Sequence, residues 1–247
     1  MNSKVRNSLA ELLLDSFKDP EKRAVIRWLD ECCKLALGRG EVRVPLNSLP
    51  ATVSEMGGSI ARAPGRLAGM EKLLRLRRAE GGASWSVEPL PDVRTDFSAV
   101  CERVRIYAGL VGRMGECEVG LCEGDPLVRA MTEAALCFNV GLFFETHEHL
   151  EHHWAAMPKG PTKRFLQGII QISVGFHHAC AGKYDGAVNQ LGKGLEKTSG
   201  MGSEFLGLAC AAFLPKVAAV RDAIVKRGRA NMRALTPQEI PHMPIRR

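Results

Sequence analysis

Apolar residues recur every three or four positions through most of this chain, which is the spacing of amphipathic helices. A helix start is clear at Asp19-Pro20, because aspartate caps free N–H groups and proline fits the first turn. Two short segments, 41–46 and 83–89, alternate apolar and polar residues instead, which predicts strands. The helices predicted in this part of the chain cover residues 1–19, 19–37, 48–56, 64–80 and 95–114.

The second half of the chain reads as helix after helix. Glycines and Pro126 predict a loop over 115–126, where the preceding helix should end. The segment after Thr236 contains three prolines, which predicts a mobile tail. The helices predicted beyond the loop cover residues 127–157, 162–181, 185–198, 203–214 and 215–229.

These elements predict a mainly α protein in which a helical bundle follows a small α+β domain. Helix, strand, two helices and a β segment is also the order of a winged helix, so the first domain is interpreted as winged-helix-like. The predicted division is an N-terminal domain over 1–91, a helix and linker over 92–126, a bundle over 127–230, and a mobile basic tail over 231–247.

Composition narrows the class of protein. The chain has 247 residues, enough to bury a core without disulfides, and 25% charged with 45% hydrophobic residues is typical of a globular protein. No apolar run reaches the length of a membrane span, and the first residues lack a signal-peptide pattern. The eight cysteines form no Cys-x-x-Cys pair. We therefore expect a reduced, cytoplasmic protein with no membrane partner.

The net charge of +7 lies at the two ends of the chain. Residues 1–91 carry +4 and residues 201–247 carry +5, whereas the segment between them is close to neutral. Six basic residues near the predicted helix 64–80 are candidates for phosphate contacts with a nucleic acid or another polyanion, and the alternative is a solvated basic face. These residues are Arg62, Arg66, Lys72, Arg75, Arg77 and Arg78.

Six of the seven histidines lie between His147 and His178. If residues 127–157 form one helix, steps of three and four place His147 in the apolar stripe, with Glu151 one turn further and Glu148 on its flank. The same phase directs Glu145, His149, His152 and His153 to the opposite, polar face. An inward His147–Glu151 pair is therefore expected.

The following helix offers partners for that pair. Gln171 and His178 lie on one edge of its apolar stripe, and two antiparallel helices would bring them toward His147, Glu148 and Glu151. Imidazole and carboxylate groups on facing helices can bind a divalent metal, for which His147, Glu151 and His178 are the predicted ligands. The same residues could instead bind a small ligand, act in acid–base chemistry, or form a buried network that fixes helix register.

The residues in this region resemble a known family. Glu145-x-His147-Glu148-x-x-Glu151-x-x-Trp154, then Phe165 to Gln171, then His178 and Gly186-Ala187, are similar to domain-of-unknown-function family 309. The resemblance covers roughly residues 130–200. It implies an all-α bundle and no defined reaction. Lys183 departs from the pattern, because the family has asparagine there to cap the next helix, and Asp185 could replace it.

Three functions remain open from the sequence. The first is a bundle that binds a divalent metal or small ligand at a buried His/Glu site. The second is a regulatory or adaptor protein that binds nucleic acid through the basic N-terminal domain, and the third is a structural bundle that forms homo-oligomers. No Gly-x-Ser-x-Gly turn or phosphate-binding loop is present, so the sequence defines no enzyme reaction.

Overall fold

The computed structural model describes residues 1–39, 44–45, 72–78, 85–121 and 125–245. The predicted mainly α fold is confirmed. The chain forms two compact units, Met1–Cys117 and Glu118–Arg247, which we describe separately. Among the described helices, none combines the length and the apolar character needed to cross a membrane.

The first unit is built on helices whose starts follow local capping rules. The Asn2 side chain accepts a hydrogen bond from Lys4 N, and Asp19 Oδ1 accepts one from Glu21 N at 2.8 Å, as the Asp19-Pro20 start predicts. Trp28 and Tyr107 are fully buried in this unit. Its helices are α1 (Ser3–Ser16), α2 (Pro20–Arg39), α4 (Pro91–Arg94) and α5 (Phe97–Leu121).

A small antiparallel sheet completes the first unit. Strands β1 (Val44–Pro45), β2 (Leu74–Arg78) and β3 (Trp85–Pro89) pair in the order β1-β3-β2. The predicted helix over 64–80 is wrong at residues 74–78, because Leu74 to Arg77 alternates apolar and basic residues and pairs along β3. The predicted helix 48–56 and the start of the 64–80 segment, with Arg62 and Arg66, lie outside the described residues.

The loop predicted over 115–126 is wrong for its first part. Helix α5 continues to Leu121, through Gly115 and Gly120, and its residues up to Cys117 belong to the first unit. An isolated glycine costs a helix only about 1 kcal/mol relative to alanine, which the rest of a long helix can offset. The segment 92–126 is therefore mostly helix.

The second unit is a helical bundle. Helix α8 packs between α7 and α9, and α9 packs against α10, as two perpendicular views show. Phe138 makes edge-to-face contacts with Phe143, Phe176 and Phe213 at the centre of the core. The helices are α6 (Pro126–Asn139), α7 (Phe143–Ala155), α8 (Pro161–Cys180), α9 (Tyr184–Thr198) and α10 (Cys210–Arg227).

Two predicted helix boundaries in this unit are wrong. The single helix expected over 127–157 is two helices, because Gly141 adopts a φ of +80° that a helix cannot contain. The break expected at Pro215 is absent, and α10 runs through this residue in its second turn. Because the helix is broken at Gly141, the side chains of α7 point in different directions from those predicted for one continuous helix.

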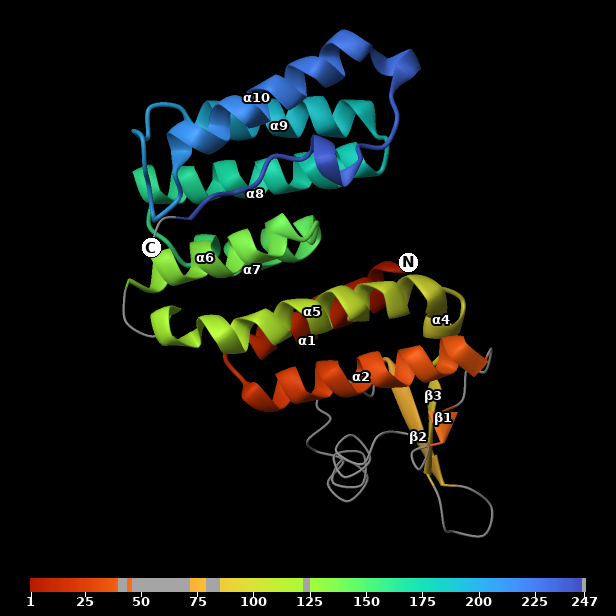
Figure 1. The fold of residues 1–247 in the computed structure, drawn as a ribbon. Coiled ribbons are helices and arrows are strands. Elements are labelled where there is room, and N and C mark those ends of the chain that lie inside the picture. Colours follow the sequence, from red (N-terminus) through yellow and green to blue (C-terminus); the bar gives the residue numbers. More distant parts are fainter. Residues whose placement is uncertain (40–43, 46–71, 79–84, 122–124, 246–247) are drawn as a thin grey trace. The chain divides into compact units, whose positions relative to one another are not determined.

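The described C-terminal residues, up to Ile245, pack on the bundle rather than forming the mobile tail predicted over 231–247. Met243 is 0% exposed, and its backbone exchanges two hydrogen bonds with the Asn139 amide, at 2.7 and 3.0 Å. Further back, Leu235 N donates to Ala179 O at 3.2 Å. The segment, with short 3-10 turns at Arg229–Asn231 and Pro237–Glu239, thus crosses from the end of α8 to the end of α6 (Figure 1).

Helices α8 and α9 approach closely through glycines. A Cβ atom added at Gly168 would lie 2.9 Å from Gly194 O and 2.6 Å from Thr198 Cγ2. One added at Gly175 would lie 2.9 Å from the backbone nitrogen of Leu191. Backbone atoms cannot withdraw as a side chain can, so these positions fix how near α9 lies to α8.

We expect Gly168→Ala to lower the free energy of unfolding by about 1–3 kcal/mol, because the added methyl overpacks this contact. Gly112→Ala on α5 is the matched control, since no atom lies within 4 Å of its added Cβ. That substitution should be neutral or stabilising by up to about 1 kcal/mol, as alanine favours helix. Urea unfolding followed by circular dichroism compares the two, and equal stabilities would contradict the prediction.

Candidate functional site

Helix α7 carries the histidine-rich segment. Hydrogen bonds of the Thr146 side chain hold the first turn of this helix against α6. The Thr146 hydroxyl donates at 2.9 Å to Leu142 O and lies 3.3 Å from Ala134 O on α6. Phe143 and Leu150 are buried on the same side of the helix. This side therefore faces the core, and it determines which of the polar residues point outward.

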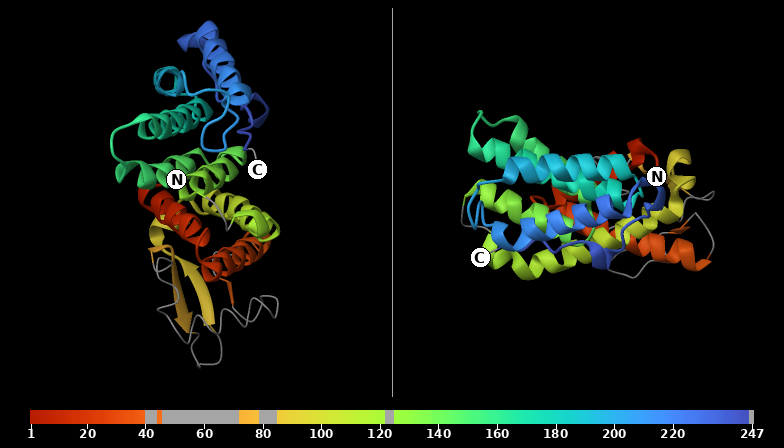
Figure 2. Two further views of the ribbon diagram at one scale, coloured as in Figure 1. Left: turned by 90° about the vertical axis from the view of Figure 1, so that its left-hand side faces the viewer. Right: turned by 90° about the horizontal axis from the view of Figure 1, so that it is seen from above.

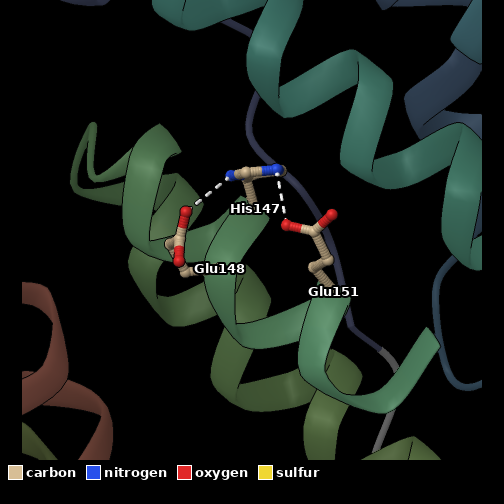
Figure 3. A group of neighbouring side chains, drawn as sticks. All are labelled: His147, Glu148 and Glu151. Atoms are coloured by element: carbon tan, nitrogen blue, oxygen red, sulfur yellow. Dashed lines mark ion pairs between the residues drawn. The ribbon is translucent and has the colours of Figure 1, made fainter. Parts of the chain in front are cut away.

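Three polar side chains gather on one flank of α7 (Figure 3). His147 lies between two carboxylates, with Nδ1 3.3 Å from Glu148 Oε1 and Nε2 3.1 Å from Glu151 Oε2. The three residues each offer one ligand atom, and these atoms lie within 4.8 Å of one another. The sequence correctly placed these residues side by side.

Their burial differs from the prediction. The side chain of His147 is 21% exposed and that of Glu151 is 49% exposed, so the expected inward pair lies at the surface of the helix flank. Glu145 and His149, expected on the outer face, are 0% and 5% exposed. The physical reason is the break at Gly141, because the apolar stripe of α6 does not continue in phase into α7.

His149 belongs to a buried ionic network that the sequence did not reveal. Its Nε2 lies 3.0 Å from Glu133 Oε2, and Arg129 Nε donates to Glu133 Oε1 at 2.9 Å. Burial disfavours the charged carboxylate, but His149 and Arg129 outweigh it, and the pKa of Glu133 is lowered. Arg129 and Glu133 are four residues apart on α6, a spacing that hints at the pair.

The structure does not bring His178 into the His147 group. The His178 ring packs over Gly186 of α9, where an added Cβ would lie 2.5 Å from the ring. Burial, with a smaller effect from Lys183, lowers the pKa of His178 and favours the neutral imidazole. Gln171 is half-buried, and its Oε1 has no hydrogen-bond partner among the described residues.

The neighbouring His177 is the histidine of α8 that lies toward α7. The Phe144 ring is 6.1 Å from the His147 ring and 6.5 Å from the His177 ring, measured between centroids. Phe144 therefore connects the two helices beside the candidate site. The sequence pattern could not choose between His177 and His178, because adjacent helical residues differ by only about 100° and the position of α7 was unknown.

The basic candidates of the first unit are only partly described. Lys72 is exposed and forms an ion pair with Glu11 at 3.0 Å, and Arg75 is exposed on β2. Arg77 and Arg78 also lie on β2, whereas Arg62 and Arg66 are outside the described residues. The described residues therefore place the basic run on a strand rather than on a recognition helix.

Comparison with known proteins identifies the bundle segment. Residues 131–190 match the family described as Domain of unknown function (DUF309), a match that covers part of α6 and all of α7 and α8 and ends within α9. No curated protein and no solved structure matches the chain. The resemblance seen in the sequence is thus confirmed, and the family itself carries no assigned reaction.

We expect Glu133→Gln to cost about 1–3 kcal/mol of stability at neutral pH, because it removes the charge that pairs with Arg129 and His149. The folded-state pKa of Glu133 lies below the ordinary 4.5, so this contribution is present above pH 4.5 and declines as the pH falls through the folded pKa. Chemical unfolding at several pH values measures it. Glu151→Gln, an exposed control on α7, should change stability by less than about 0.5 kcal/mol. A pH-independent Glu133→Gln effect would contradict the assignment.

Proposed function

We propose that His147, Glu148 and Glu151 bind a divalent metal ion. One imidazole nitrogen and two carboxylate oxygens suit Zn²⁺, Mn²⁺ or Fe²⁺. The observation that carries this proposal is the convergence of the three ligand atoms within 4.8 Å. Ligands of one tetrahedral ion are about 3.4 Å apart. Because Glu148 faces Nδ1 and Glu151 faces Nε2, binding through one nitrogen requires the carboxylate at the other edge of the ring to turn toward the ion.

The partial exposure of the group favours a ligand over a register-fixing network. Carboxylates that serve only to fix a helix are expected to be buried and fully bonded. Glu148 and Glu151 have side chains that are 39% and 49% exposed, whereas Glu133 and His149 already form a buried network on the other flank of α7. The His147 group is therefore not needed for that role and is accessible to an ion.

A metal held by three side chains would keep positions for water or a small ligand. Such an ion can polarise a bound carbonyl or phosphoryl group and lower the pKa of a bound water molecule. His147 would supply the nitrogen ligand, and its contact with Phe144 would limit rotation of the ring.

We expect the tag-free chain to bind Mn²⁺ or Zn²⁺ at this group, and the double variant His147→Ala/Glu151→Gln to lose that binding while remaining folded. Isothermal titration calorimetry with each ion measures the affinity, and circular dichroism tests folding. His152→Ala is the matched control, because His152 is exposed on the same helix and outside the group. Equal Mn²⁺ affinity in the wild-type chain and the double variant would exclude the site.

A nucleic-acid function of the first unit is a second candidate. It is supported by the strands, since β1 follows α2 and the antiparallel β2–β3 pair comes later in the chain, which is the order of strands in a winged helix. The exposed Arg75 on β2 is available for a phosphate contact. In this interpretation Arg77, the next basic residue on the strand after Leu76, extends the same basic run.

We expect Arg75→Ala/Arg77→Ala to weaken binding of duplex DNA or RNA at low salt about equally for all sequences, because phosphate contacts carry no base information. The slope of log affinity against log salt concentration should become shallower by about one to two, because one or two fewer counterions are released on binding. Fluorescence anisotropy measures both quantities, with Lys193→Ala on α9 as a basic control in the other unit. Absence of any binding by the wild-type chain at low salt would rule out this function.

A further inference from the structure

We propose that a basic surface of the second unit, where α10 ends and α9 begins, binds the phosphate groups of a nucleic acid. This C-terminal basic surface consists of Lys183, Arg227, Arg229 and Arg233. It contains no residue of the His147 group and none of the first unit. The proposal therefore depends on neither of the functions proposed above.

Arg229 joins the residues that follow α10 to the start of α9. Its Cζ atom lies 5.7 Å from the centroid of the Tyr184 ring, and its Nη2 donates a hydrogen bond to Asp185 Oδ1. Lys183 directly precedes Tyr184 and is exposed. The tertiary structure thus places two cations at one end of α9, although they are far apart in the chain.

Arg227 and Arg233 share one carboxylate beside this contact. Arg233 Nη1 donates to Glu239 Oε2 at 2.8 Å, and Arg227 Nη2 donates to Glu239 Oε1 at 3.2 Å. The backbone of Arg233 also passes close to the start of α9, because a Cβ atom added at Gly182 would lie 3.9 Å from its carbonyl carbon. Gly182 immediately precedes Lys183, so all four cations surround the same end of the bundle.

The surface has more positive charge than its own ion pairs neutralise. Its carboxylates are Asp185 and Glu239, so the four cations retain a net charge of +2. Lys183 forms no ion pair with the described residues. The side chains of Arg229 and Arg233 are 71% and 54% exposed, and a guanidinium group has more N–H donors than one carboxylate can bind. These three side chains are accessible to phosphate oxygens.

Helix stability does not account for this excess of charge. Cations at the C-terminus of a helix interact favourably with its dipole, which explains Arg227 on the last turn of α10. Lys183 instead lies at the N-terminal end of α9, where the dipole disfavours positive charge. An anionic partner would offset this unfavourable position.

The side chains on this surface favour a nucleic acid over a membrane. Three of its four cations are arginines, whose planar guanidinium groups bind phosphate oxygens through paired N–H donors. A membrane-binding surface adds aromatic or large aliphatic side chains that enter the lipid. The exposed neighbours of the arginines are Ala230, Asn231 and Ala234, and Val225 is the one large apolar residue exposed in the described part of the second unit.

The test compares two double variants of the full, tag-free chain that lose the same charge. Lys183→Gln/Arg229→Gln should weaken binding of labelled duplex RNA or DNA at low salt about tenfold, and the slope of log affinity against log salt concentration should become shallower by about two. Lys193→Gln/Lys216→Gln removes two exposed cations from α9 and α10 outside the surface, and it should change affinity less than about twofold. Fluorescence anisotropy measures both, and circular dichroism tests folding.

A third variant should change affinity in the opposite direction. Asp185→Asn removes the carboxylate that pairs with Arg229 and raises the charge of the surface, so it should tighten binding about two- to fivefold. A variant that failed to fold would not bind more tightly. Unchanged or weaker binding by Asp185→Asn would therefore count against the proposal.

Other outcomes would overturn the proposal outright. One is an equal effect of the two double variants, which would show that only the net charge of the chain matters. Another is complete loss of binding in an Arg75→Ala/Arg77→Ala chain, which would place all contacts in the first unit. A third is binding of vesicles that contain an anionic phospholipid without binding of either duplex, which would identify the surface as a membrane contact.

Discussion

The rotation of α7 about its own axis is the constraint on which the candidate site depends. The helix begins after Gly141, whose left-handed conformation ends the phase of α6. The contact between His149 and Glu133 then fixes which side of α7 meets α6. Glu133 is buried and pairs with both Arg129 and His149, so this pairing favours the observed rotation of α7. His147, two residues before His149, is thereby placed on an accessible flank.

This rotation divides a dense polar segment into parts with different chemistry. One flank presents an imidazole between two half-exposed carboxylates, and the other holds an imidazole nitrogen 3.0 Å from a buried carboxylate. The groups therefore differ in their partners and in their burial. A single helix of 13 residues therefore presents two distinct polar environments.

The rest of the bundle holds α7 and α8 in place. Glycines on α8 let α9 approach closely on one side, and Phe144 contacts both His147 and His177 on the other. The C-terminal segment joins the ends of α6 and α8 through Met243 and Leu235. These contacts are non-local, and they stabilise the part of the chain that matches the uncharacterised family.

Local sequence determined the helical class, the helix start at Pro20 and the existence of α8 and α9. It also determined the grouping of His147 with Glu148 and Glu151. Each of these features depends on neighbours within a few residues along the chain. It could not determine burial across Gly141, since one glycine can either remain in a helix, as Gly115 does, or end it. It also assigned residues 74–78 to a helix, where pairing with β3 decided for a strand. Only the tertiary structure decided which histidines face the core and that Leu235 and Met243 of the C-terminal segment are buried, because burial depends on partners far away in the chain.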